Sequence, residues 1–133
     1  MDLMDASIRK KHRKLAEQLW FKTKDGEGVE WRAAAYGDGF ESSIGSYIVT
    51  IREVKGAFDA PDYVVSLLDQ SYENIDSFSD EEISEDGVSP KVGDFSNYYT
   101  LLSDLFRTAQ RRSKGADKAL DSVLAALDDD IPF

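Results

Sequence analysis

Residues 40–51 have the sequence FESSIGSYIVTI and predict a β-hairpin. Side chains alternate in period two from Phe40 to Ile44 and again from Tyr47 to Ile51, as expected for two strands. Gly45 and Ser46 separate the halves, and glycine takes the positive φ that the first central position of a type II′ turn requires. The stretch therefore predicts two adjacent antiparallel strands.

Three more strands are expected around this hairpin. Residues 31–35 alternate in the same way and lead into the glycine-rich turn at residues 37–39. After the hairpin, residues 63–67 and 72–78 predict two further strands, joined by a turn at Gln70 and Ser71. We therefore expect an antiparallel meander of about five strands.

Helical periodicity precedes and follows the meander. Residues 5–22 predict an amphipathic helix that Asp5 or Ser7 would cap. Ser79 and Glu82 have the spacing of a capping box, so a short helical turn is expected after the last strand. Residues 84–93 predict a flexible loop. The apolar face of the first helix carries Ile8, His12, Leu15, Ala16, Leu19 and Trp20.

Two helices are predicted in the C-terminal third. Asp94 would cap the first, and Gly115 would end it. The second runs from Ala116 to Leu127. The first has an apolar stripe made of Phe95, Tyr98, Tyr99, Leu101, Leu102, Leu105, Phe106 and Ala109. The sequence thus predicts an α+β fold: an N-terminal helix, the meander, then two C-terminal helices packed on the sheet, with a flexible acidic tail.

Composition limits the class of protein. A chain of 133 residues with 41% hydrophobic content is expected to form one domain, residues 1–127, followed by a short tip, residues 128–133. The absence of cysteine excludes disulfides and thiolate zinc sites. Apolar runs are too short to cross a membrane, and residues 1–20 lack the hydrophobic segment of a signal peptide. A cytoplasmic location is expected.

The net charge of −10 is unevenly distributed. Residues 1–24 carry seven basic and three acidic groups, whereas residues 25–97 carry four basic and 17 acidic groups. Affinity for DNA depends largely on lysine and arginine replacing condensed counterions. Direct nucleic-acid binding by the whole surface is therefore not expected.

The tip combines negative charge with apolar side chains. Its residues are Asp128, Asp129, Asp130, Ile131, Pro132 and Phe133. Phe133 is expected to offer a ring and a terminal carboxylate together, which suits a receptor with an apolar pocket and a basic rim. Burial of the ring and of part of Ile131 is worth roughly 1.5 to 3 kcal/mol each, less the cost of ordering the peptide. The balance predicts a micromolar-class contact.

The tip resembles the C-terminal tip of bacterial single-stranded DNA-binding proteins, with which those proteins recruit replication, recombination and repair enzymes. The resemblance covers residues 128–133 alone. That family has an oligonucleotide-binding barrel and a long linker before its tip, and this sequence predicts neither. The resemblance implies that Phe133 fills the main receptor pocket, that Ile131 and Pro132 make secondary contacts, and that the aspartates face basic residues.

The function expected from this resemblance is a non-enzymatic interaction module for genome-maintenance proteins. It would either recruit the chain to those proteins or compete with their usual ligand. Two alternatives remain for the tip: it is a tail that only keeps the chain in solution, or Phe133 folds back on its own domain. The oligomeric state is left open.

The alternative function is inhibition by an acidic body that mimics nucleic acid. Its candidate surface consists of Asp80, Glu81, Glu82, Glu85 and Asp86. These residues lack the spacing of a calcium-binding EF-hand loop, so no metal or other cofactor is expected. A basic surface made of Arg9, Lys10, Arg13 and Lys14 would bind nucleic acid or an acidic partner, the acidic middle of this chain, or the tip of a neighbouring molecule. Trp20, Phe21 and Trp31 lie near it in sequence.

An enzyme is the least favoured class. His12 is the only histidine, and no acidic residue lies near it in sequence to form a catalytic pair. The motif that surrounds a nucleophilic serine is absent. His12 is therefore expected to belong to the helix face.

Overall fold

The sheet is a five-stranded antiparallel meander. The computed structural model describes residues 3–25, 28–56 and 60–128. The strands are β1 (Arg32–Ala33), β2 (Phe40–Ile44), β3 (Tyr47–Lys55), β4 (Pro61–Leu68) and β5 (Asn74–Ser79), and they pair in this order. Ile44 pairs with Tyr47 across the predicted turn, where Gly45 has a φ of +61°. The predicted hairpin is confirmed.

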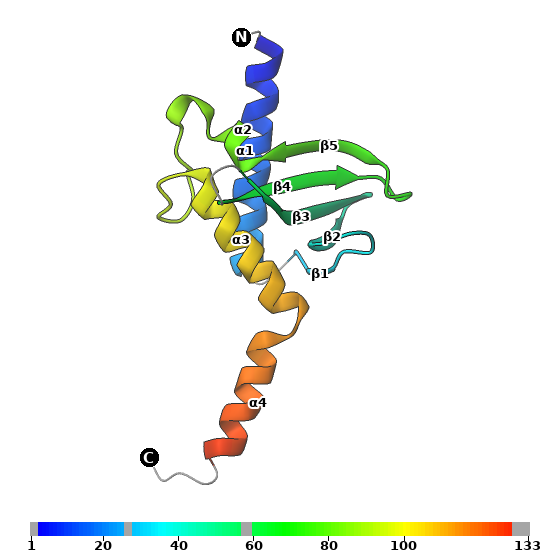
Figure 1. Ribbon diagram of the computed structural model, residues 1–133, viewed down its shortest axis with the longest axis vertical. Coiled ribbons are helices and arrows are strands. Elements are labelled where there is room, and N and C mark those ends of the chain that lie inside the picture. Colours follow the sequence, from blue (N-terminus) through cyan, green and yellow to red (C-terminus); the bar gives the residue numbers. More distant parts are fainter. Residues whose placement is uncertain (1–2, 26–27, 57–59, 129–133) are drawn as a thin grey trace.

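The helices lie before and after the sheet in sequence (Figure 1). They are α1 (Leu3–Asp25), α2 (Asp80–Ile83), the short 3-10 helix η2 (Glu85–Gly87), α3 (Tyr98–Ser113) and α4 (Ala116–Asp128). Helix α3 contacts β1 to β4 and packs beside α1, whereas α4 leads away from the body (Figure 1). The predicted α+β class and order of elements are confirmed. Within the described residues, no helix has the length and apolar character needed to span a bilayer.

A continuous core joins α1, α3 and one face of the sheet. Alternate residues of the strands and the stripe of α3 supply most of its side chains, as the sequence periods predict. Its buried members are Ala16, Leu19, Val29, Trp31, Phe40, Val49, Ile51, Tyr63, Val65, Phe78, Ile83, Tyr98, Leu101, Leu102, Leu105 and Ala109.

The predicted caps of the two long helices are wrong. Helix α1 already includes Asp5, whose charge lies in the first turn and suits the helix dipole. Helix α3 begins after Asn97, whose side chain accepts the Thr100 N–H at 2.8 Å, so Asp94 is not its cap. Phe95 therefore lies before the helix, where it packs edge-on against Trp20. The Ser79 cap of α2 is confirmed, because its hydroxyl accepts the Glu82 N–H.

Two strands are shorter than predicted because local hydrogen bonds compete with strand pairing. The Ala34 N–H donates to the Gly39 carbonyl at 3.0 Å and closes the loop immediately after β1. The Asp69 carboxylate accepts the N–H groups of Ser71 and Glu73. This wider turn holds Tyr72 at a φ of +65°, so β5 begins at Asn74 rather than Tyr72. The loop at residues 84–93 contains η2, which the sequence did not predict.

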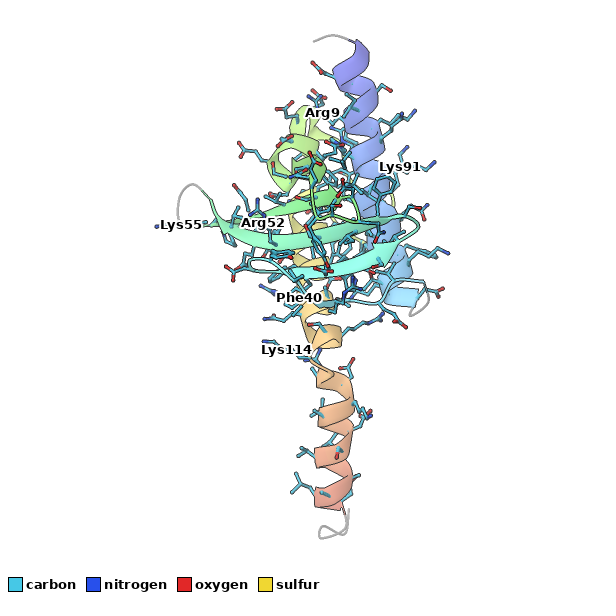
Figure 2. All side chains as sticks on the ribbon, turned by 90° about the vertical axis from the view of Figure 1, so that its right-hand side faces the viewer. Arg9, Phe40, Arg52, Lys55, Lys91 and Lys114 are labelled. Atoms are coloured by element: carbon cyan, nitrogen blue, oxygen red, sulfur yellow. The ribbon has the colours of Figure 1, made fainter. Side chains whose placement is uncertain are left out.

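The prediction that both C-terminal helices pack on the sheet is wrong for α4. Gly115, at a φ of +64°, separates α3 from α4. None of the residues of α4, all of which are described, is buried. Figure 2 shows α4 extending beyond Lys114, away from the sheet, with side chains that project on both sides of the helix. The helical period of residues 116–127 predicted the helix, but it does not indicate whether the helix packs against the sheet.

Candidate interaction surfaces

An apolar stripe on α4 faces solvent. Its members are Leu120, Val123, Leu124 and Leu127, and each is about half exposed (48–56%). Their spacing of three and four residues puts them on one face of the helix. Asp121 and Asp128 lie three residues before and four residues after Leu124, so they flank the same face. The stripe is therefore apolar along its centre and acidic along one edge.

An isolated helix of this length is marginally stable in water, so packing normally supplies its stability. The body supplies little here, because α4 contacts α3 near their junction and Arg111 pairs with Asp117 across that junction at 2.5 Å. A contiguous exposed apolar face usually marks a surface that binds another molecule. The stripe is therefore a candidate interaction surface.

The predicted tip begins at the end of α4. Asp128 is the last residue of the helix and is exposed. Residues 129–133, which carry the rest of the predicted docking peptide, lie outside the described residues. The structure therefore fixes the point of attachment, at the end of α4 farthest from the sheet (Figure 1).

The residues of the predicted acidic surface have different structural roles and do not form one free surface. Asp80 is buried, and its carboxylate accepts the Tyr63 N–H at 2.7 Å. Burial raises the pKa of Asp80, and that hydrogen bond opposes the rise. Glu82 belongs to the capping box of α2. Glu81 is exposed.

The rest of the predicted acidic surface binds the predicted basic surface. Arg9 forms ion pairs with Glu85 at 2.8 Å and with Asp86 at 3.1 Å. Arg13 donates to the backbone carbonyls of Ile83 at 2.8 Å and Glu85 at 2.6 Å. The two arginines therefore hold the loop after α2 against α1. Lys10 and Lys14, the other predicted basic residues, are exposed.

His12 has an acidic partner that the sequence did not reveal. Its Nε2 lies 2.8 Å from Asp76 Oδ2, and its ring stacks on Phe78 at 4.5 Å. Both partners belong to β5, far from His12 in sequence, so the fold alone brings them together. Among the residues that the structure describes, no group of three or more His, Asp or Glu side chains could hold a metal ion.

The aromatic residues near the basic surface have structural roles. Trp31 is buried and donates to Thr23 Oγ1 at 3.0 Å, and Trp20 donates to Asp104 Oδ2 at 2.7 Å. Phe21 is half exposed. Trp20 and Trp31 are therefore occupied in the body, and stacking on nucleic-acid bases receives no support from them.

A shallow groove beside α1 was missed by sequence reasoning. It has a volume of about 500 Å³ and is lined by Leu15, Gln18, Leu19, Lys22, Gly28, Val29 and Ile44. Residues 11, 15, 18 and 22 follow helical spacing, so Lys11 lies on the same face as the α1 side of the groove. Lys14 precedes Gln18 by one turn. The spacing of the lysines was visible in the sequence, but the approach of Val29 and Ile44 to α1 was not.

Glu41 is a second feature that the sequence did not indicate. It is buried in the sheet and accepts hydrogen bonds from the Ala35 N–H at 2.7 Å, Arg32 at 2.7 Å and the Tyr72 hydroxyl at 2.9 Å. Burial by itself would raise the pKa of Glu41, but these three donors outweigh it and lower the pKa. The carboxylate is fully satisfied, and its role is to fix the loop after β1 and the turn at Tyr72.

Comparison with known proteins gives no further assignment. No protein-family model matches the chain, and neither the curated proteins nor the solved structures include a match.

Proposed function

We propose that this chain is a non-enzymatic interaction protein that presents residues 128–133 to DNA replication, recombination or repair proteins. The observation that carries the proposal is the position of α4. This helix leads away from the body, buries none of its residues and ends at Asp128 (Figure 1). The point where residues 129–133 are attached therefore lies away from the acidic body.

We call residues 116–133 the C-terminal arm. The chemistry of its helical part agrees with that of its tip. Its helical part has an apolar stripe flanked by Asp121 and Asp128, and its tip joins three aspartates to Ile131 and Phe133. Both parts suit a partner with an apolar surface and a basic rim. Electrostatic attraction would speed association and make the complex sensitive to salt.

The acidic body is a weaker candidate for the working surface. Glu85 and Asp86 pair with Arg9, and Asp80 is buried. Charges that are neutralised within the chain contribute little to a nucleic-acid-like field. The geometry thus supports the arm more than the body.

The test is capture of partners by the full chain from bacterial lysate, with mass spectrometry to identify them and calorimetry to confirm direct binding. Phe133→Ala keeps the charge of the tip and removes its ring. We expect it to weaken binding at least about tenfold, since the ring is worth roughly 1.5 to 3 kcal/mol when buried. A free peptide with the sequence of residues 128–133 should displace the same partners.

The proposal also requires a free carboxylate on Phe133. Extension by two glycines moves that carboxylate and leaves every side chain in place, so this variant should lose binding as well. If wild type and Phe133→Ala capture the same proteins with the same affinity, the proposal is wrong.

A further inference from the structure

We propose that the groove beside α1 binds the tip, residues 128–133, of a second copy of this chain. The inference deepens the proposed function, on which it rests for the docking character of the tip. It adds a means of regulation: the chain holds its own tip in a reciprocal or head-to-tail assembly until a partner competes for it.

The first argument is the apolar chemistry of the groove. Leu15 and Leu19 on one side and Val29 and Ile44 on the other give it apolar walls. Its volume of about 500 Å³ is in the range of small-molecule pockets, enough for an aromatic and an aliphatic side chain. The tip supplies one of each in Phe133 and Ile131.

The second argument is charge. Lys22 lines the groove, and Lys11 and Lys14 extend the basic edge along α1. All three are exposed, and none of them forms an ion pair with a residue that the structure describes. By contrast, the neighbouring cations Arg9 and Lys24 are paired with acidic side chains at 2.8 Å and 2.9 Å.

These lysines place three positive charges along one helix of a chain whose net charge is −10. Three lysines that pair with no described acidic side chain lie on the α1 side of an apolar groove, and they complement three aspartates followed by Ile-Pro-Phe. The same arrangement, an apolar pocket with a basic rim, is what a receptor for this tip requires. The groove therefore selects the tip over an uncharged apolar peptide.

The third argument concerns which copy supplies the tip. Helix α4 has 13 residues and so holds Asp128 roughly 20 Å from Gly115, on the side away from the sheet (Figure 1). The five residues that follow span at most about 18 Å when extended. Because this span is shorter than α4 itself, we expect the tip to occupy the groove of a second copy and not the groove of its own chain.

Sedimentation equilibrium of the full chain over a range of concentrations tests the proposal. Wild type should self-associate in a salt-sensitive manner. The groove variant, Lys11→Glu with Lys14→Glu and Lys22→Glu, should weaken this association at least about tenfold. A matched control, Lys10→Glu with Lys55→Glu and Lys91→Glu, makes the same change of net charge at exposed positions outside the groove and should retain it.

A mixing experiment adds a test that general charge repulsion cannot imitate. A chain lacking residues 131–133 keeps the groove, and the groove variant keeps the tip. Neither should self-associate, but the two should associate when mixed. Circular dichroism of each variant establishes that it is folded. The proposal is overturned if wild type is monomeric throughout, if the groove variant associates as wild type does, or if mixing produces no complex.

The same variants separate this inference from the proposed function. The groove variant retains an intact tip, so it should capture the genome-maintenance partner at least as well as wild type. If removing residues 131–133 abolishes capture while self-association is unchanged, the proposed function stands and the inference fails. If self-association is lost and capture is unchanged, the inference stands and the proposed function fails.

Discussion

Two leucine substitutions in adjacent helices measure how far α4 is separate from the body. Leu105 in α3 is fully buried (0% exposed), whereas Leu124 in α4 is 48% exposed. We expect Leu105→Ala to lower the free energy of unfolding by about 2 to 5 kcal/mol, through lost burial and the cavity left behind. The identical change at Leu124 should cost less than about 0.5 kcal/mol, as at other surface positions.

The assays are urea unfolding for the free energy and thermal unfolding for Tm, both followed by the fluorescence of Trp20 and Trp31 at a protein concentration low enough to keep the chain monomeric. At roughly 3 °C for each kcal/mol in a domain of this size, Leu105→Ala should lower Tm by at least about 6 °C. Leu124→Ala should leave Tm nearly unchanged. Equal losses for the two variants would refute the reasoning, because they would mean that α4 is packed against the body.

Three further changes test the site and the fold. The pKa of Glu41 is lowered on folding, so its ionised form stabilises the fold above its ordinary pKa of 4.5, and this contribution is lost as pH falls below that value. Glu41→Gln should therefore flatten the acid side of the stability profile measured by urea unfolding between pH 7 and pH 3. Asp80→Ala removes the acceptor of the buried Tyr63 N–H and should lower the free energy of unfolding by about 1 to 3 kcal/mol. Asp80→Asn keeps an acceptor without the buried charge, so this variant should be at least as stable as wild type at pH 7. Asn97→Ala should cost about 1 kcal/mol by removing the cap of α3, and Asp94→Ala, at the cap position expected from sequence, should cost much less, as thermal unfolding would show.

Long-range contacts account for most of what sequence reasoning missed. The signals that predicted the hairpin and the Ser79 cap involve residues within a few positions of each other, and they were correct. The pairs Arg9 with Asp86, His12 with Asp76, and Glu41 with Tyr72 join residues that are 77, 64 and 31 positions apart. Nothing in the local pattern distinguishes Arg9, which is paired, from Lys10, which is exposed.

The misplaced helix cap has a similar cause. Asp94 and Asn97 are both good capping residues, so the sequence alone could not rank them. Phe95 packs against Trp20 of α1, and that contact places residues 94–96 outside the helix. The helix consequently begins where the next capping side chain is available, at Asn97.

The sequence by itself determined the elements and their order, because period two, helical spacing and turn glycines act through neighbouring residues. It also determined which charged and apolar side chains residues 128–133 carry, since these follow from the residue types alone. Tertiary structure decided which charges are neutralised within the chain, where the lysine-edged groove lies, and that α4 stands apart from the sheet. The paired charges and the groove depend on which distant segments approach one another. The position of α4 depends on the direction that the chain takes at Gly115, and the sequence does not reveal it because an exposed helix and a packed helix have the same period.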